Sequence, residues 1–192
     1  MVQDRRREVI NICLNHFIEK GLSETSTRSL SSALKLQNAG LYYYFESKDI
    51  AVIQCAEEAA IRLETALIPP VFDEIQDPDL MMNNLQKRAD EMAATMRFFV
   101  SVCVSERYKD GIKPVLDQLE YRYHQYATKI ANVLMCDVED IEPYVYMAIT
   151  AVANYMIFRE DNLINPQMGL VKQAIKLLQG KKKLAACQSV AG

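Results

Sequence analysis

Side chains that can bind a nucleic acid are concentrated in residues 21–49, GLSETSTRSLSSALKLQNAGLYYYFESKD. Asparagine and glutamine can bond bidentately to adenine and arginine to guanine, while a small apolar side chain can touch a thymine methyl group. Lysine and tyrosine can bind phosphate oxygens, and glycine lets a backbone approach DNA closely. The candidate residues, in chain order, are Thr27, Arg28, Gln37, Asn38, Ala39, Gly40, Tyr42, Tyr43, Tyr44 and Lys48.

Two short helices joined by a tight turn would position these side chains. The hydroxyl residues of 25–27 suit a helix start, and Leu30 and Leu34 would be buried. A turn at 35–37 then leads to a helix over 38–45. In a hairpin of this kind the second helix lies in the major groove and presents its first residues to base edges. Those residues are 38–40 here.

The aromatic run Tyr42–Phe45 has two interpretations, a core patch or a contact surface. Successive residues of a helix turn by about 100°, so four in a row cannot all face inward. Leu41 and Phe45 are four apart and are expected to pack inward. The exposed remainder favours a contact surface.

Charge is weak support for nucleic-acid binding, because the net charge of the chain is −3. Residues 1–50 hold seven Lys and Arg against six Asp and Glu, whereas the remainder holds 15 against 19. The local field matters more for phosphate contact than the total charge.

Features of an enzyme, a metal site or a membrane protein are not found in the sequence. The cysteines are odd in number and far apart, and His16 with Cys13 would need further metal ligands. His124 has no evident nucleophile to serve. No apolar run reaches the ~18 residues of a membrane span. We expect a cytoplasmic, non-enzymatic protein with reduced thiols and no metal or cofactor.

The rest of the chain also predicts helices, so the fold class is all-α. Glycine and proline number six each and mark the predicted helix ends, such as Gly21, Pro69-Pro70, Gly111 and Pro114. Ser47 is a plausible cap for a helix to about Ala66. The predicted helices are 3–20, 25–34, 38–45, 48–66, 79–108, 114–135, 140–161 and 166–179.

The N-terminal motif closely resembles that of the tetracycline-repressor (TetR) family of bacterial regulators. The matching residues are Gly21, Thr25–Arg28 and Leu41–Asp49, in order and spacing. The resemblance implies that Tyr42 and Tyr44 contact phosphate, together with Lys48. Tyr43 would touch base or backbone, and Arg28 guanine or backbone.

Two residues depart from the family pattern. Lys35 stands where the family usually has glycine, and Gln37 where it has serine or threonine. Lys35 must adopt a left-handed conformation, which costs about 1 kcal/mol, or the turn must differ. These departures keep open a second interpretation, a helical adaptor that has lost specific DNA binding.

The resemblance implies a domain order and a dimer. We expect a three-helix DNA-binding domain at 1–48, a larger helical-bundle domain for effector binding and dimerisation at 49–180, and a flexible tail at 181–192. A homodimer would form through the last two long helices. The predicted interface residues are Val145, Ala148, Ile149, Val152, Leu170, Ala174, Ile175 and Leu178.

The implied function is a transcriptional regulator of a palindromic operator, usually a repressor that a small molecule releases. Activation and co-repression remain alternatives. Apolar and hydroxyl side chains of the second domain could line the effector pocket, although such residues are more often ordinary core. The predicted lining residues are Met92, Met96, Phe99, Cys103, Tyr121, Tyr126, Tyr155 and Met156.

Overall fold

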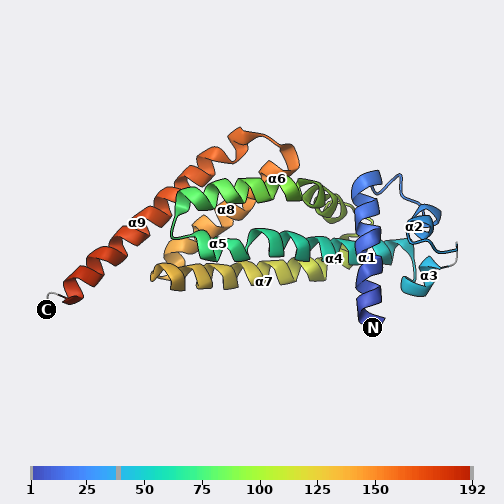
Figure 1. Ribbon diagram of the computed structural model, residues 1–192, viewed down its shortest axis with the longest axis horizontal. Helices are drawn as coiled ribbons and strands as arrows, with labels where there is room; N and C mark the ends of the chain where they lie inside the picture. The colour runs from blue at the N-terminus through green and yellow to red at the C-terminus, as the bar shows by residue number, and fades with distance from the viewer. Residues whose placement is uncertain (1, 38–39, 191–192) are drawn as a thin grey trace. The chain divides into compact units, whose positions relative to one another are not determined.

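A computed structural model describes residues 2–37 and 40–190, and within these ranges all regular structure is helical (Figure 1). The elements are α1 (Val2–Lys20), α2 (Thr27–Ala33), α3 (Leu41–Tyr44), α4 (Lys48–Leu67), α5 (Pro69–Glu74), α6 (Pro78–Cys103), α7 (Lys109–Leu134), α8 (Val138–Phe158), the 3₁₀ turn η1 (Asp161–Leu163) and α9 (Asn165–Val190). The all-α prediction is confirmed.

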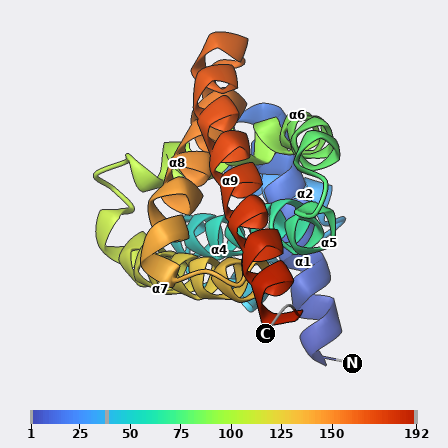
Figure 2. The ribbon, with the colours of Figure 1, turned by 90° about the vertical axis from the view of Figure 1, so that its left-hand side faces the viewer.

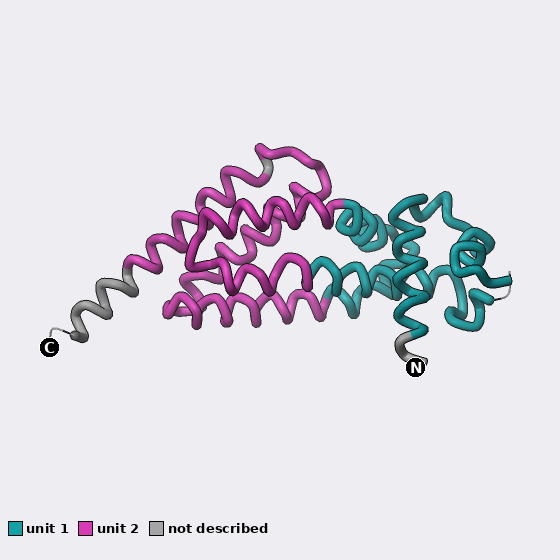
Figure 3. Tube along the Cα trace, viewed as in Figure 1, with its two compact units in different colours: residues 1–64, 94–116 teal, residues 65–93, 117–192 magenta. Residues whose placement is uncertain are grey.

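The chain divides into two compact units (Figure 3). The first unit comprises residues 1–64 and 94–116, and the second comprises residues 65–93 and 117–192. The first unit therefore contains α1–α3, most of α4, the end of α6 and the start of α7. The predicted functional domains, 1–48 and 49–180, remain a prediction.

The core of the first unit forms around α1 and α4. On α1, Val9, Leu14 and Phe17 are buried, and Phe17 stacks on Phe98 of α6 with ring centroids 5.7 Å apart. Cys13 and Cys55 are fully buried, and the Cys55 thiol donates to the carbonyl of Ile10 at 3.6 Å. Burial raises the pKa of Cys13 to about 12, which keeps this thiol protonated and unreactive.

The second unit contains α5, α8, α9 and the adjoining parts of α4, α6 and α7. Helices α8 and α9 lie side by side (Figure 2). Arg88 of α6 holds Glu74 of α5 through two hydrogen bonds of 3.0 and 2.8 Å. Lys172 and Lys176 of α9 both bind Asp79 in the first turn of α6. These ion pairs fix α5 and α9 against α6 within the unit.

Several predicted helix boundaries are wrong. Gly111 and Pro114 were expected to separate two helices, but both lie inside α7. The preceding helix was expected to reach Tyr108, whereas α6 ends at Cys103. Pro69 and Pro70 end α4 as predicted, yet they also open α5, because proline is well tolerated in the first turn of a helix.

The final helix continues past its predicted end at Gln179 to Val190. The prediction that residues 181–192 form a flexible tail is not tested by this helix assignment. Within the part of the chain that the structure describes, no helix is long and apolar enough to span a membrane.

Candidate nucleic-acid interface

Helix α2 begins at a capping box built from two serines. The backbone N–H of Ser29 donates to Oγ of Ser26, and the N–H of Ser26 donates to Oγ of Ser29, both at 3.0 Å. Because the first N–H groups of a helix have no intrahelical partner, this exchange fixes where the helix starts. Thr25, just before the cap, is buried and donates to the carbonyl of Gly21 at 2.7 Å. The predicted cluster of hydroxyl residues therefore defines the entry to α2.

The turn after α2 contains Lys35 in a left-handed conformation, with φ of 54°. The N–H of Lys35 donates to Ser32 O at 3.0 Å, and the N–H of Leu36 donates to Ser31 O at 2.8 Å. This is the Schellman arrangement, which usually has glycine at the left-handed position. Of the two alternatives for Lys35, the structure shows the first: lysine accepts the strained conformation, and the turn keeps its form.

Helix α3 packs beside α2 (Figure 1). Leu41 is fully buried and Phe45 is 2% exposed, so the inward pair is confirmed. Tyr42 and Tyr43 are 57% and 84% exposed, and Tyr44 is half-buried against the edge of Tyr43. The aromatic run is therefore divided between core and surface, as the turn angle of a helix requires.

Gly40 directly precedes the first residue of α3. Besides the predicted close approach to DNA, it has a role in packing. A Cβ atom added to Gly40 would lie 2.7 Å from Cβ of Leu36. Glycine therefore lets α3 lie close to the turn. Asn38 and Ala39, the predicted base-contacting residues, lie outside the described residues.

The remaining candidates differ in how free they are. Arg28 and Gln37 are exposed, whereas Thr27 is half-buried. The ammonium group of Lys48 donates to the carbonyl of Leu22 at 3.1 Å. Lys48 therefore holds the connection between α1 and α2, and an ammonium group retains two further N–H donors that could reach a phosphate.

Arg5 is a basic residue near this surface that the sequence interpretation missed. Hydrogen bonds with Tyr44 and then with Glu8 raise the pKa of its guanidinium above the usual value. Its Nη1 lies 2.8 Å from Oε2 of Glu8. The run Arg5–Arg7 was visible in the sequence, but only folding shows that Arg5 reaches Tyr44 of α3.

Contacts between α4 and the α6–α7 connection support the hairpin within the first unit. Arg107 donates to Oδ2 of Asp49 from Nε at 3.1 Å and from Nη2 at 3.0 Å. Asp49 follows Lys48 in the first turn of α4. Next to this pair, a Cβ atom on Gly111 would lie 2.3 Å from Cδ1 of Ile53, so α7 approaches α4 very closely. Residues 107–111 therefore hold the first turns of α4 through two contacts, one at Asp49 and one at Ile53.

The predicted effector and dimer residues are divided between several environments. Of the pocket set, Met96, Phe99 and Cys103 belong to the first unit and the other five to the second. Of the dimer set, Leu170 is exposed, and Ala148 and Ile149 are half-buried. The buried members, which pack within the protomer itself, are Val145, Val152, Ala174, Ile175 and Leu178. Both sets remain predictions.

The N-terminal segment matches a known family. Residues 14–50 fit the sequence model of the bacterial regulatory proteins of the tetR family, so the resemblance read from the motif is confirmed. These residues include α2, α3 and the start of α4. No curated protein matches the chain in sequence.

Solved structures share the fold along nearly the whole chain. A tetR-family transcriptional regulator from Streptomyces coelicolor has a TM-score of 0.61 at 16% identity, covering 98% of this chain and 84% of that one. The regulator PfmR from Thermus thermophilus has a TM-score of 0.53 at 14% identity, covering 89% and 96%. The multidrug binding protein EbrR, complexed with imidazole, has a TM-score of 0.54 at 13% identity, covering 88% and 94%. The chain therefore shares its fold with structures of transcriptional regulators, and residues 14–50 match the tetR-family sequence model.

Proposed function

We propose that this chain, whose N-terminal segment is that of a tetR-family regulatory protein, is a dimeric repressor of a palindromic operator that a small molecule releases. The observation that carries the proposal is the division of α3 into an anchored side and a free side. Leu41 and Phe45 fix the helix to the core, while Tyr42 and Tyr43 remain exposed beside it. We infer from these exposed tyrosines that this side of α3 contacts a partner.

The polar residues of the hairpin divide into two roles. Tyr42 and Tyr44 supply hydroxyl donors for phosphate oxygens, and Arg28 supplies a guanidinium for guanine or phosphate. Phosphate contacts fix the register of the protein on DNA, whereas base contacts select the sequence. The base contacts fall to Gln37 and to the neighbouring residues 38–40.

Dimerisation is required because the DNA-binding hairpin of one protomer is small. One hairpin makes few contacts, whereas specific regulators bury a protein surface on the order of 1,000–2,500 Å² on DNA. Two copies related by a twofold axis would read an inverted repeat. The exposed apolar side chains of α9 support a partner contact on that helix, because Leu170 and Leu177 are 53% and 70% exposed.

Release by an effector would be a population shift between DNA-competent and incompetent dimers. A ligand changes that balance only by the difference in its affinity for the two states. Helix α4 is the element that we expect to transmit the change, because Asp49 contacts Arg107 in the α6–α7 connection and Ile53 lies against Gly111 of α7.

The test is a titration of a duplex enriched from a random pool, followed by fluorescence anisotropy at several salt concentrations. Tyr42→Phe should weaken binding by the dimer roughly a hundredfold, because each of the two protomers loses a hydrogen bond to a charged group, at about 1.5 kcal/mol each. Its salt dependence should not change, since no charge is removed. Arg28→Gln should lower the salt slope by about one per protomer if Arg28 binds phosphate, and should relax one base position if it binds guanine.

Glu46→Gln is a matched control, because Glu46 is exposed next to Phe45 but offers no hydroxyl or cation to DNA. Equal affinity of wild type and Tyr42→Phe for the enriched duplex would contradict the assigned role of α3. Weak binding that disappears with salt, in the wild type itself, would favour the helical adaptor.

A further inference from the structure

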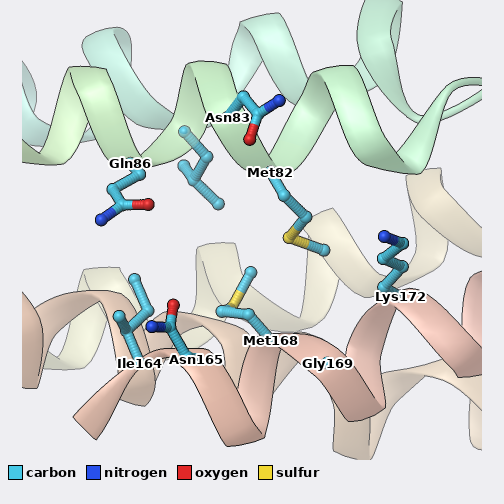
Figure 4. Close-up of a pocket in the computed structure, with 9 residues that line it drawn as sticks. Met82, Asn83, Gln86, Ile164, Asn165, Met168, Gly169 and Lys172 are labelled. Carbon is cyan, nitrogen blue, oxygen red and sulfur yellow. The ribbon is translucent and has the colours of Figure 1, made fainter. Parts of the chain in front are cut away.

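The second unit contains a groove of about 220 Å³ that none of the predicted pocket residues lines (Figure 4). It lies between the first half of α6 and the first turns of α9. The lining residues are Met82, Asn83, Leu85, Gln86, Ile164, Asn165, Met168, Gly169 and Lys172. We propose that this groove binds a small, neutral, planar molecule. The claim that the bound molecule is the effector rests on the proposed function, whereas the claim that the groove binds such a molecule does not.

The base of the groove is apolar and adaptable. Leu85, Ile164 and Met168 are buried, and Met82 is half-buried. Figure 4 shows the thioethers of Met82 and Met168 pointing toward one another from the two helices. Methionine fills irregular space, and its sulfur makes favourable contacts with aromatic rings. The groove is therefore best suited to a ligand with a flat ring, which would lie between the two thioethers.

The charges around the groove favour a neutral ligand. No carboxylate belongs to the lining, and Asp79 and Asp161, which lie beside it, already bind the lining residues Lys172 and Gln86, so a cation would have to compete for them. The lining cation, Lys172, already binds Asp79, so an anion would have to compete with that ion pair. The amides of Asn83 and Asn165 are exposed and can donate to or accept from a carbonyl or hydroxyl on the ligand.

Because Gly169 has no side chain, the groove reaches the backbone of α9 at this position. A Cβ atom at this position would meet no atom within 4 Å, so the space beside it is open. Glycine inside a helix is destabilising by roughly 0.5–1 kcal/mol relative to alanine, and nothing in the packing of Gly169 requires it. Gly180, in the same helix but outside the groove, also has open space around it.

The size of the groove limits the ligand. Sites for drug-sized ligands occupy roughly 300–1,000 Å³, and this groove is smaller. We therefore expect a body of one or two fused rings with one hydrogen-bonding substituent. A long acyl chain or a polycyclic ligand would extend out of it.

The experiment compares two dimethylaminonaphthalene dyes of similar size on the full-length protein. Prodan is neutral and carries a ketone, whereas 5-dimethylaminonaphthalene-1-sulfonate is an anion. Wild type should bind prodan saturably with a blue-shifted emission at one dye per protomer. The sulfonate should bind at least about tenfold more weakly.

The variant Gly169→Leu should weaken prodan binding at least about tenfold, because a larger side chain fills the groove. The matched variant Gly180→Leu should leave prodan affinity within about twofold of wild type. Both replacements improve helix propensity, so their melting temperatures should not fall below that of wild type. Equal prodan affinity of the two variants, non-saturable binding, or tighter binding of the sulfonate would overturn the proposal.

DNA titrations of the same preparations separate the two proposals. Wild type that binds an enriched duplex but shows no Gly169-dependent prodan binding overturns the groove alone. Wild type that binds prodan in the groove but selects no duplex overturns the regulator and leaves the site intact.

Discussion

Lys35 has a left-handed backbone conformation in the turn between α2 and α3, although its side chain carries a Cβ atom. The left-handed conformation brings Cβ too close to the following carbonyl oxygen, at a cost of roughly 1–2 kcal/mol. Met135 has the same conformation at the end of α7, with φ of 55° and the same pair of hydrogen bonds. Two turns of this protein are thus strained in the same way.

Lys35→Gly should therefore raise the free energy of unfolding by about 1 kcal/mol, because glycine adopts φ above zero without that clash. The melting temperature should rise by about 2–4 °C for a chain of this size. Met135→Gly is the control and should give a similar gain by calorimetry. No gain from Lys35→Gly alongside a gain from Met135→Gly would show that the Lys35 side chain stabilises the turn.

Gly40 presents the opposite case, in which a glycine cannot be replaced. Gly40→Ala would place a Cβ atom 2.7 Å from Cβ of Leu36, so α3 must move. Overpacking of this kind costs about 1–3 kcal/mol, and α3 carries the exposed tyrosines. We expect a lower melting temperature and weaker binding of the enriched duplex. Gly180→Ala should instead raise the melting temperature, and an unchanged Gly40→Ala protein would refute the close-packing argument.

At the scale of elements, capping chemistry was predictable from the sequence and helix continuity was not. Ser47 was predicted to cap α4, and the N–H of Ile50 donates to its Oγ at 3.2 Å. A cap depends on neighbours within one turn, so the local sequence is sufficient. Gly111 was misinterpreted as a breaker, because its close contact with Ile53 involves a helix far away in the sequence.

The ion pair between Asp49 and Arg107 joins α4 to the α6–α7 connection. The Arg107 side chain is 65% exposed, so solvent screens the pair and it should contribute little to global stability. Its effect should be local. Asp49→Asn and Arg107→Gln should each increase hydrogen exchange at residues 49–53 by a similar factor, measured by mass spectrometry.

The double variant should exchange no faster than either single variant, because both changes remove one interaction. Lys109→Gln is the control: Lys109 pairs with Glu106 in the same region, at 3.7 Å, but has no partner in α4 among the contacts described. Additive effects of Asp49→Asn and Arg107→Gln would show that the pair does not couple the two elements.

At the scale of the whole molecule, the exposed leucines of α9 bear on assembly. Leu170 and Leu177 are seven apart and so lie on one face of the helix. The sequence predicted Leu170 for the interface but could not separate the apolar positions that pack inside the protomer from those left outside. Helical periodicity identifies apolar positions, and only packing shows which of them are already covered.

Leu177→Glu should convert the proposed dimer into monomers at micromolar concentration, because a buried unpaired charge opposes association. The melting temperature of the monomer core should change little, since Leu177 is 70% exposed. Leu80→Glu is the control, with Leu80 49% exposed on α6. Sedimentation velocity checks both, and a Leu177→Glu protein that stays dimeric would move the interface elsewhere.

The sequence predicted what kind of site this is, but it did not predict several of the contacts that build it. The residue types of 21–49 and the inward positions of Leu41 and Phe45 followed from local sequence. The hydrogen bond from Lys48 to the Leu22 carbonyl and the approach of Arg5 to Tyr44 did not, because each joins segments far apart in the chain. The groove beside Gly169 was missed for the same reason.

Selection of duplexes from a random pool by the purified protein, followed by sequencing, tests the central claim most directly. The account predicts an enriched inverted repeat whose half-sites face the two α3 helices of a dimer, bound specifically at physiological salt. A pool that stays random after repeated rounds, with binding that disappears as salt rises, would contradict sequence-specific recognition by this hairpin.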